Sequence, residues 1–237
     1  QQEEASGENL FKLAIQEIYK EDNYFNKYAF KLTRSLTRQE IILKREQYEL
    51  EGRFDEDLED DPPGRELMPN EITYIKTGIS DRVKRRYAFK IARWFVNTMI
   101  KKHQLIIEDI QGIENYAGLT SGAIITCNHF NAFDNFALHY AFYPYLKTNL
   151  YKVIREGNYT SFPGFYGLLF RHCKTLPLSS NYSCLKLFLS AVDTLLKRGE
   201  KILVYPEQGM WWNYRKPRPM ASGAFKFAVT SKAPILP

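Results

Sequence analysis

From about residue 105 onwards, short apolar segments alternate with helical ones. Residues 122–127 (GAIITC), 201–205 (KILVY) and 234–236 are apolar and rich in β-branched side chains, which is typical of buried strands. Residues 133–146 and 182–198 have the length and the apolar spacing of helices. This alternation predicts an α/β fold, with a mixed, mostly parallel sheet flanked by helices.

The charge distribution divides the chain into two parts. Residues 1–66 carry 10 Lys/Arg and 17 Asp/Glu, a net charge of −7, which leaves +13 for residues 67–237. Residues 8–50 are rich in helix formers, and 54–64 (FDEDLEDDPPG) are acidic and end in Pro-Pro-Gly. We expect a helical N-terminal extension and linker over 1–66, and one domain over 67–237. That domain stops directly after an apolar run, so we expect its C-terminal end to be incomplete.

A domain with a charge of +13 attracts anionic partners, which include phosphates, CoA-like molecules, acidic lipid headgroups and nucleic acid. Residues 82–106 form a basic amphipathic segment whose aromatic side favours a lipid interface, the core of the domain, or both. No run of eighteen apolar residues is present, so we expect any membrane contact to be peripheral. The three cysteines have no paired spacing, which favours reduced thiols and hence the cytoplasmic face.

The string CNHFNAFDN, residues 127–135, follows a predicted strand and opens a predicted helix. With His129 in the turn and Asp134 in the first helical turn, the carboxylate can reach back to the imidazole. Such a contact fixes the tautomer of the histidine and stabilises the imidazolium that forms when it accepts a proton. The alternative is an aspartate that caps the helix beside a packed histidine. Backbone N–H groups of the same turn are candidates for stabilising an oxyanion.

Downstream residues give this string its context. The chain resembles the lysophospholipid and glycerol-phosphate acyltransferase family, whose four ordered sequence blocks it largely reproduces over roughly 105–237. The first block, Asn-His-x4-Asp, is matched by Asn128, His129 and Asp134. The third, Phe-Pro-Glu-Gly, reads YPEQG at 205–209, and the fourth is an apolar run that ends in proline at 233–237. Between these two, residues 222–229 (SGAFKFAV) resemble the family's Gly-Ala helix.

The resemblance implies transfer of a fatty acyl group from acyl-CoA or acyl-carrier protein to a hydroxyl of a lysophospholipid. It makes 1-acyl-glycerol-3-phosphate the foremost acceptor and phospholipid biosynthesis the setting. His129 is then the catalytic base and Asp134 its orienting partner, while Asn128, Glu207 and Gly209 contact substrate. A buried structural role for Glu207 is the alternative. Because an acyl thioester is already activated, no cofactor and no metal is expected.

The second block departs from the family pattern, because it normally ends in an arginine that holds the acceptor's phosphate. The matching stretch here, 174–180, has Leu178 or Ser179 at that position. Two cations lie just upstream. The aromatic and basic string 210–219 (MWWNYRKPRP), which suits a phosphate-rich interface or ordinary surface packing, holds three more, and Arg215 and Lys216 come first after the third block. The candidate phosphate ligands are therefore Arg171, Lys174, Arg215 and Lys216, with Arg215 favoured. In the third block Gln208 takes the glycine position, and Gly209 comes one residue late.

Three other functions compete with this interpretation. A nucleic-acid protein would explain the basic charge, but no recognised nucleic-acid motif accompanies it, so we expect no nucleic-acid partner. A serine hydrolase would need Gly-x-Ser-x-Gly, which the sequence lacks. A catalytically silent lipid-binding relative would keep the fold and not the turnover. Acylation of a glycolipid or another acceptor without phosphate stays open because of the altered second block.

Overall fold

The structure is a computed structural model that describes residues 38–58, 64–116, 118–146 and 150–237. Most of the predicted helical extension, residues 1–37, lies outside the described residues. The helices are α3 (Arg38–Glu51), α4 (Ile79–Lys101), α5 (Asp134–Leu146), α6 (Glu156–Ser161), α7 (Gly164–His172), α8 (Tyr182–Lys197) and α9 (Gly223–Ser231), with short 3-10 turns at Pro69–Glu71 and Ile113–Tyr116.

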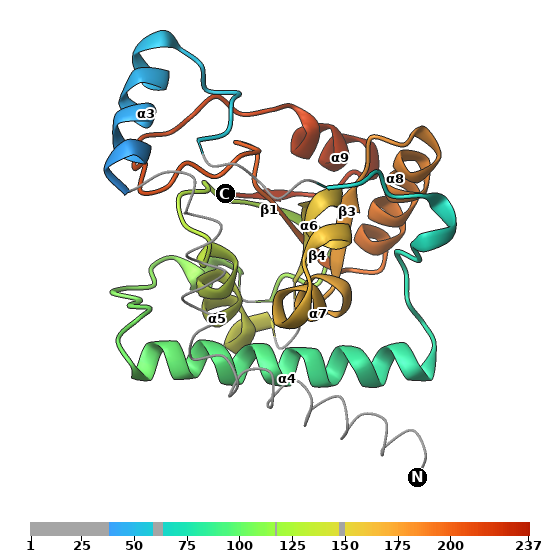
Figure 1. The fold of residues 1–237 in the computed structure, drawn as a ribbon. Helices are drawn as coiled ribbons and strands as arrows, with labels where there is room; N and C mark the ends of the chain where they lie inside the picture. The colour runs from blue at the N-terminus through green and yellow to red at the C-terminus, as the bar shows by residue number, and fades with distance from the viewer. Residues whose placement is uncertain (1–37, 59–63, 117, 147–149) are drawn as a thin grey trace.

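Five short strands form a single sheet in the order β3-β2-β4-β1-β5 (Figure 1). The strands are β1 (Ala123–Thr126), β2 (Tyr151–Arg155), β3 (Thr175–Leu178), β4 (Lys201–Val204) and β5 (Ile235–Leu236). Every neighbouring pair is parallel. The predicted α/β class is confirmed, and the sheet is parallel throughout rather than mixed. Each crossover between strands contains a helix, which returns the chain to the same edge of the sheet.

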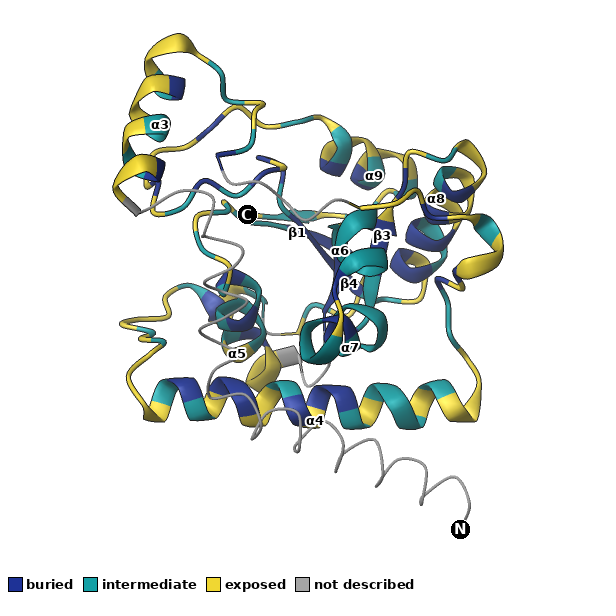
Figure 2. Ribbon diagram, viewed as in Figure 1, coloured by how far each residue is buried: buried dark blue, intermediate teal, exposed yellow. Residues whose placement is uncertain are grey.

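Helices cover both faces of this sheet. Alternate residues of a strand point to opposite faces, so Ile124 and Ile202 join α8 and α9 in one core cluster, whereas Ile125 and Leu203 pack with α5 in another. Figure 2 shows buried residues on the sheet and on the helix faces turned toward it. The carboxyl ends of β1 and β4 lie side by side between these layers. Ligands of open α/β sheets bind at this edge.

Most of the basic segment 82–106 lies in α4, which ends at Lys101. Its apolar side is buried, with Phe89, Ile91, Phe95 and Met99 all at most 8% exposed, and the helix packs against α7. The core-packing interpretation therefore holds for this face. The opposite face keeps exposed basic residues, and Trp94 is 38% exposed. Among the described residues, no helix has the length and apolar character that crossing a bilayer requires.

The N-terminal segment 38–58 packs on the loop that follows β4. Trp211 is completely buried there, stacked on Phe54 with ring centroids 5.5 Å apart and in a cluster with Tyr48 and Leu58. The indole N–H donates to the carbonyl oxygen of Glu56 at 2.9 Å. The described part of the predicted linker is therefore a fixed piece of the fold. Trp211 is a core residue, not an interfacial one.

Candidate active site

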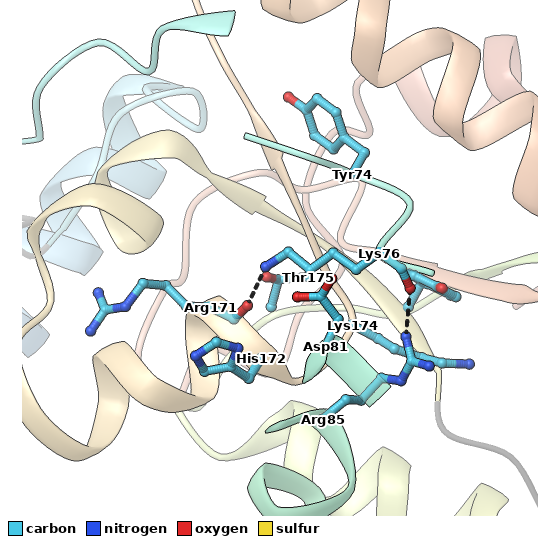
Figure 3. Close-up of a pocket in the computed structure, with 9 residues that line it drawn as sticks. Tyr74, Lys76, Asp81, Arg85, Arg171, His172, Lys174 and Thr175 are labelled. Atoms are coloured by element: carbon cyan, nitrogen blue, oxygen red, sulfur yellow. Dashed lines mark hydrogen bonds between the residues drawn. The ribbon is translucent and has the colours of Figure 1, made fainter. Parts of the chain in front are cut away.

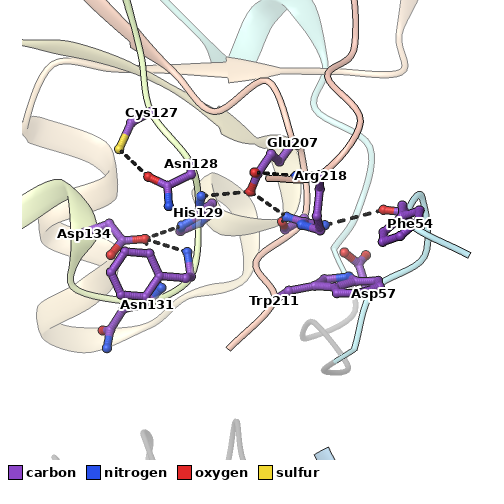
Figure 4. Close-up of polar contacts among 12 residues, drawn as sticks. Phe54, Asp57, Cys127, Asn128, His129, Asn131, Asp134, Glu207, Trp211 and Arg218 are labelled. Atoms are coloured by element: carbon purple, nitrogen blue, oxygen red, sulfur yellow. Dashed lines mark hydrogen bonds and ion pairs between the residues drawn. The ribbon is translucent and has the colours of Figure 1, made fainter. Parts of the chain in front are cut away.

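His129 and Asp134 meet in the loop between β1 and α5, as the spacing predicted. The Nδ1 atom of His129 lies 2.9 Å from Oδ2 of Asp134 (Figure 4). The same oxygen accepts hydrogen bonds from the backbone N–H groups of Phe130 and Asn131, each at 2.9 Å. Asp134 is 8% exposed and is the first residue of α5. Its carboxylate therefore holds both the imidazole and the turn that carries it.

The other ring nitrogen of His129 is available for chemistry. Because Asp134 accepts a hydrogen bond from Nδ1–H, Nε2 carries the lone pair. Nε2 has no hydrogen-bond partner in the part of the chain that the structure describes, and the side chain is 22% exposed. The ring stacks on Tyr205 with centroids 4.1 Å apart and planes 18° apart. This arrangement presents an oriented imidazole, a candidate general base, at the carboxyl edge of the sheet.

Glu207, in the loop after β4, connects that loop to the turn after β1 that carries His129. Its Oε2 accepts from the backbone N–H of His129 at 3.0 Å and from Nη2 of Arg218 at 3.2 Å, while Oε1 accepts from the backbone N–H of Arg218 at 3.2 Å. The residue is 7% exposed. Both carboxylate oxygens thus bind protein donors, which is the structural role considered as the alternative. A role in acceptor binding stays a prediction.

Arg218 belongs to the string 210–219, for which the sequence left a phosphate-rich interface and ordinary surface packing open. It is 3% exposed, and its guanidinium lies 5.0 Å from the centroid of the Trp211 ring. Besides Glu207, it donates to the carbonyl oxygens of Gly209 and Phe54. Burial lowers the pKa of Arg218, and the neighbouring Glu207 carboxylate opposes that shift. This pair fixes the loop after β4 against the His129 turn.

The hypothesis that the His129 turn supplies oxyanion donors is wrong for the first three N–H groups of that turn. The backbone N–H of His129 donates to Glu207, and those of Phe130 and Asn131 donate to Asp134. All three are engaged by buried carboxylates and are not directed at a substrate atom. These three bonds fix the turn that carries the His129 side chain.

A second feature that the sequence analysis missed is an ion pair at the same edge. Arg155 is the last residue of β2, and its Nη1 and Nη2 contact the two carboxylate oxygens of Asp57 at 2.6 and 2.8 Å. Arg155 pairs in register with Leu178, one of the two positions where the family arginine is expected. The one hint in the sequence was that the second block lacks its arginine. A neighbouring parallel strand can carry a cation to the same edge of the sheet, and Arg155 of β2 lies at that place.

The altered third block fits this geometry. Gln208 has a φ of 65°, in the left-handed region that favours glycine, which is the residue that the family has at this position. At Gly209 the requirement is a close approach. A Cβ there would collide with Oδ1 of Asp57 and lie 3.5 Å from Nη2 of Arg155. Arg155 and Asp57 therefore lie directly against the third block.

The remaining predicted site residues are dispersed. Arg171 and Lys174 precede β3 and line a basic pocket with Lys76 and Arg85 at the amino ends of the strands, the edge opposite His129 (Figure 3). The structure thus does not bring these two cations to His129, because all strands run parallel and the two lie at the opposite edge of the sheet.

The other predicted substrate-binding residues are Asn128, which directly precedes His129, and two cations on the loop that follows β4. Arg215 is exposed on that loop, and Lys216 forms an ion pair with Glu49 of α3. Asn128 is exposed beside His129 and accepts a hydrogen bond from the Cys127 thiol at 3.6 Å. Within the described residues, no group of three or more His, Cys, Asp or Glu side chains is placed to hold a metal ion.

A histidine held by a carboxylate at the carboxyl edge of a parallel sheet is an arrangement that suits general-base chemistry in an α/β enzyme. The Acyltransferase family model matches residues 105–237, more than half of the chain. The chain belongs to this family, and it is an acyltransferase. The resemblance found in the sequence is thereby confirmed. Comparison with curated proteins and with solved structures gives no match.

Proposed function

We propose that this acyltransferase moves a fatty acyl group from an acyl thioester, acyl-CoA or acyl-carrier protein, to the hydroxyl of a lysophospholipid. The foremost acceptor is 1-acyl-glycerol-3-phosphate, as in phospholipid biosynthesis. The observation that carries the proposal is the 2.9 Å contact between His129 Nδ1 and Asp134, within the matched region, which leaves Nε2 available.

The proposed chemistry needs no covalent enzyme intermediate. Nε2 of His129 removes the proton of the acceptor hydroxyl as its oxygen attacks the thioester carbonyl. The new C–O ester bond forms, the C–S bond breaks, and the imidazolium returns its proton to the departing thiolate. Asp134 stabilises the imidazolium between these two transfers, as the aspartate of a catalytic triad does.

The geometry also supports an acceptor that carries phosphate. A buried anion without a partner costs several kcal/mol, so the site needs a fixed cation. Arg155 lies against Gly209 at the edge that presents His129, and a guanidinium suits bidentate phosphate recognition. Arg215, on the loop after β4, is the second candidate. A glycolipid or another neutral acceptor is the alternative, favoured by the uncharged side chain of Leu178.

We further propose that the enzyme works as a peripheral protein on the cytoplasmic face of an anionic membrane. The support is the exposed basic face of α4, which includes Arg82, Arg86 and Arg93, together with the part-exposed Trp94. Lysine and arginine side chains near an acidic surface each contribute about 1 kcal/mol to binding. Tryptophan favours the headgroup level.

The test is a panel of lysophospholipid and neutral glycolipid acceptors, each offered with acyl-CoA and with acyl-carrier protein and analysed by mass spectrometry. We expect acylated product from a phosphate-bearing acceptor, and none from the His129→Ala enzyme. Transfer only to neutral acceptors would reject the proposal that the acceptor carries a phosphate group. Retained lipid binding without any product would instead identify a silent relative.

A further inference from the structure

We infer that Asp57 is an internal ligand of the acceptor subsite: it pairs with Arg155, and the acceptor's phosphate displaces it. This inference rests on the proposed function, because it concerns the regulation of the same site. It assigns the acidic segment before the domain a role as a built-in competitor for anionic acceptors.

The contact has the form that a bound phosphate would take. Two parallel bonds, at 2.6 and 2.8 Å, join the guanidinium of Arg155 to the carboxylate of Asp57. This fork geometry is the one that arginine uses for phosphate oxygens as well. One edge of a guanidinium holds one such partner at a time. A phosphate that binds this edge must therefore displace the carboxylate.

The backbone around Asp57 is fixed, while its side chain is not. Nζ of Lys44 donates to the carbonyl oxygens of Asp57 and Leu58 at 3.3 and 2.8 Å, and Leu58 is completely buried. Trp211 binds the carbonyl of Glu56 from the other side. The side chain of Asp57 is nevertheless 37% exposed, and that of Arg155 is 45% exposed. Displacement thus requires a side-chain rotation and no unfolding of the segment.

The competition is weak enough to be reversible. Ion pairs with this degree of exposure change an equilibrium by a factor of about 1.5 to 5. A phosphate monoester carries more negative charge at neutral pH than a carboxylate. It therefore displaces Asp57, whereas singly charged carboxylates compete poorly. The consequence is that the pair raises the KM of every acceptor that needs Arg155 by this same factor and leaves neutral acceptors unaffected.

The experiment compares Asp57→Asn with Asp55→Asn, a matched exposed acid two residues away with no ion pair among the described residues. We expect Asp57→Asn to lower the KM for 1-acyl-glycerol-3-phosphate by a factor of about 2 to 5. The KM for acyl-CoA and for a neutral acceptor should not change, nor should any KM in the Asp55 variant. A purely structural Asp57 would give the opposite sign, a higher acceptor KM.

A binding measurement separates this inference from the proposed function. Glycerol 3-phosphate and inorganic phosphate are titrated calorimetrically into the His129→Ala protein, with and without Asp57→Asn or Asp57→Ala. Tighter binding in both Asp57 variants, lost on adding Arg155→Gln, supports the inference even if no acyl transfer is ever observed. The inference is overturned if both Asp57 variants unfold at the parental temperature and yet bind glycerol 3-phosphate and inorganic phosphate no more tightly than the parent.

Discussion

The Oδ2 atom of Asp134 binds three donors, the Nδ1–H of His129 and the backbone N–H groups of Phe130 and Asn131, each at 2.9 Å. One oxygen atom therefore sets the orientation of the His129 imidazole and the conformation of the turn that carries it. A change at Asp134 cannot affect the imidazole alone. A change at His129 leaves the other two bonds in place, which makes the two residues separable by experiment.

His129→Ala should abolish acyl transfer while the protein remains folded. Removal of a general base lowers turnover by a factor of about 10² to 10⁴. The turn keeps its two bonds to Asp134, so the unfolding temperature should stay close to that of the parent. Turnover assays and thermal unfolding test this together, and near-normal turnover would refute the mechanism.

Asp134→Ala should lower both activity and stability. Two partly buried backbone N–H groups lose their acceptor, and an unsatisfied group costs up to about 1–3 kcal/mol where water cannot reach it. We expect a drop in the free energy of unfolding that exceeds that of His129→Ala, measured by urea denaturation. Equal stability of the two variants would show that the turn does not depend on the carboxylate.

Three arginine variants should separate the candidate phosphate ligands. Arg155→Gln should raise the KM for a phosphate-bearing acceptor far more than the KM for acyl-CoA, because only the acceptor carries charge to that subsite. Arg215→Ala tests the second candidate in the same way. Arg171→Gln is the control, since Arg171 lies at the opposite edge of the sheet. A change of acceptor KM with Arg171 alone would invalidate the assignment.

Binding to vesicles should depend on their charge and on salt. The basic domain should sediment with anionic vesicles at low ionic strength and be released as salt rises, since screening acts over about 10 Å at 0.1 M. Arg82→Gln with Arg86→Gln, both exposed on α4, should weaken sedimentation without changing the fold. Equal binding to neutral and anionic vesicles would exclude an electrostatic origin.

Acid should destabilise the protein through His139. Burial, with help from Lys152 and other nearby cations, lowers the pKa of His139 to about 3, so the folded state keeps this histidine neutral. The unfolded chain binds a proton below pH 6.5, so stability is full above that pH and is lost as the pH falls toward 3. The slope approaches about 1.4 kcal/mol per pH unit. His139→Phe should flatten urea-unfolding stability between pH 6.5 and 4.5, and an unchanged slope would contradict this.

Local patterns predicted the elements with strong periodicity. Strands β1, β4 and β5 and helices α4, α5 and α8 appear where apolar spacing indicated them. The segment from β2 to β3 was not predicted, for two physical reasons. Strand β2 contains Lys152, which is buried and donates to Asn135, so its charge hid a core strand. Strand β3 contains Pro177, which is tolerated because β3 lies at the edge of the sheet.

The site shows the same limit. The contact between His129 and Asp134 was predictable because five residues of chain bring the two together across one turn. The place of Arg155 was not, because it depends on the spatial order of β2, β4 and β1. Its partner Asp57 lies 98 residues away in the sequence, in a segment whose acidity suggested only a linker. The positions of Arg155 and Asp57 depend on strand order and on contacts between distant residues, which the spacing of residues in one sequence does not reveal.

The burial of Trp211 against residues 38–58 also bears on how the protein should be cut for study. A fragment that starts at residue 105, where the family match begins, would lack Phe54 and Leu58 and leave that indole in water. It would also lack Leu67 and Tyr74, which are buried in the cluster under α8. The cooperative unit therefore reaches at least to Tyr48, and a fragment trimmed to the family boundary should aggregate instead of folding.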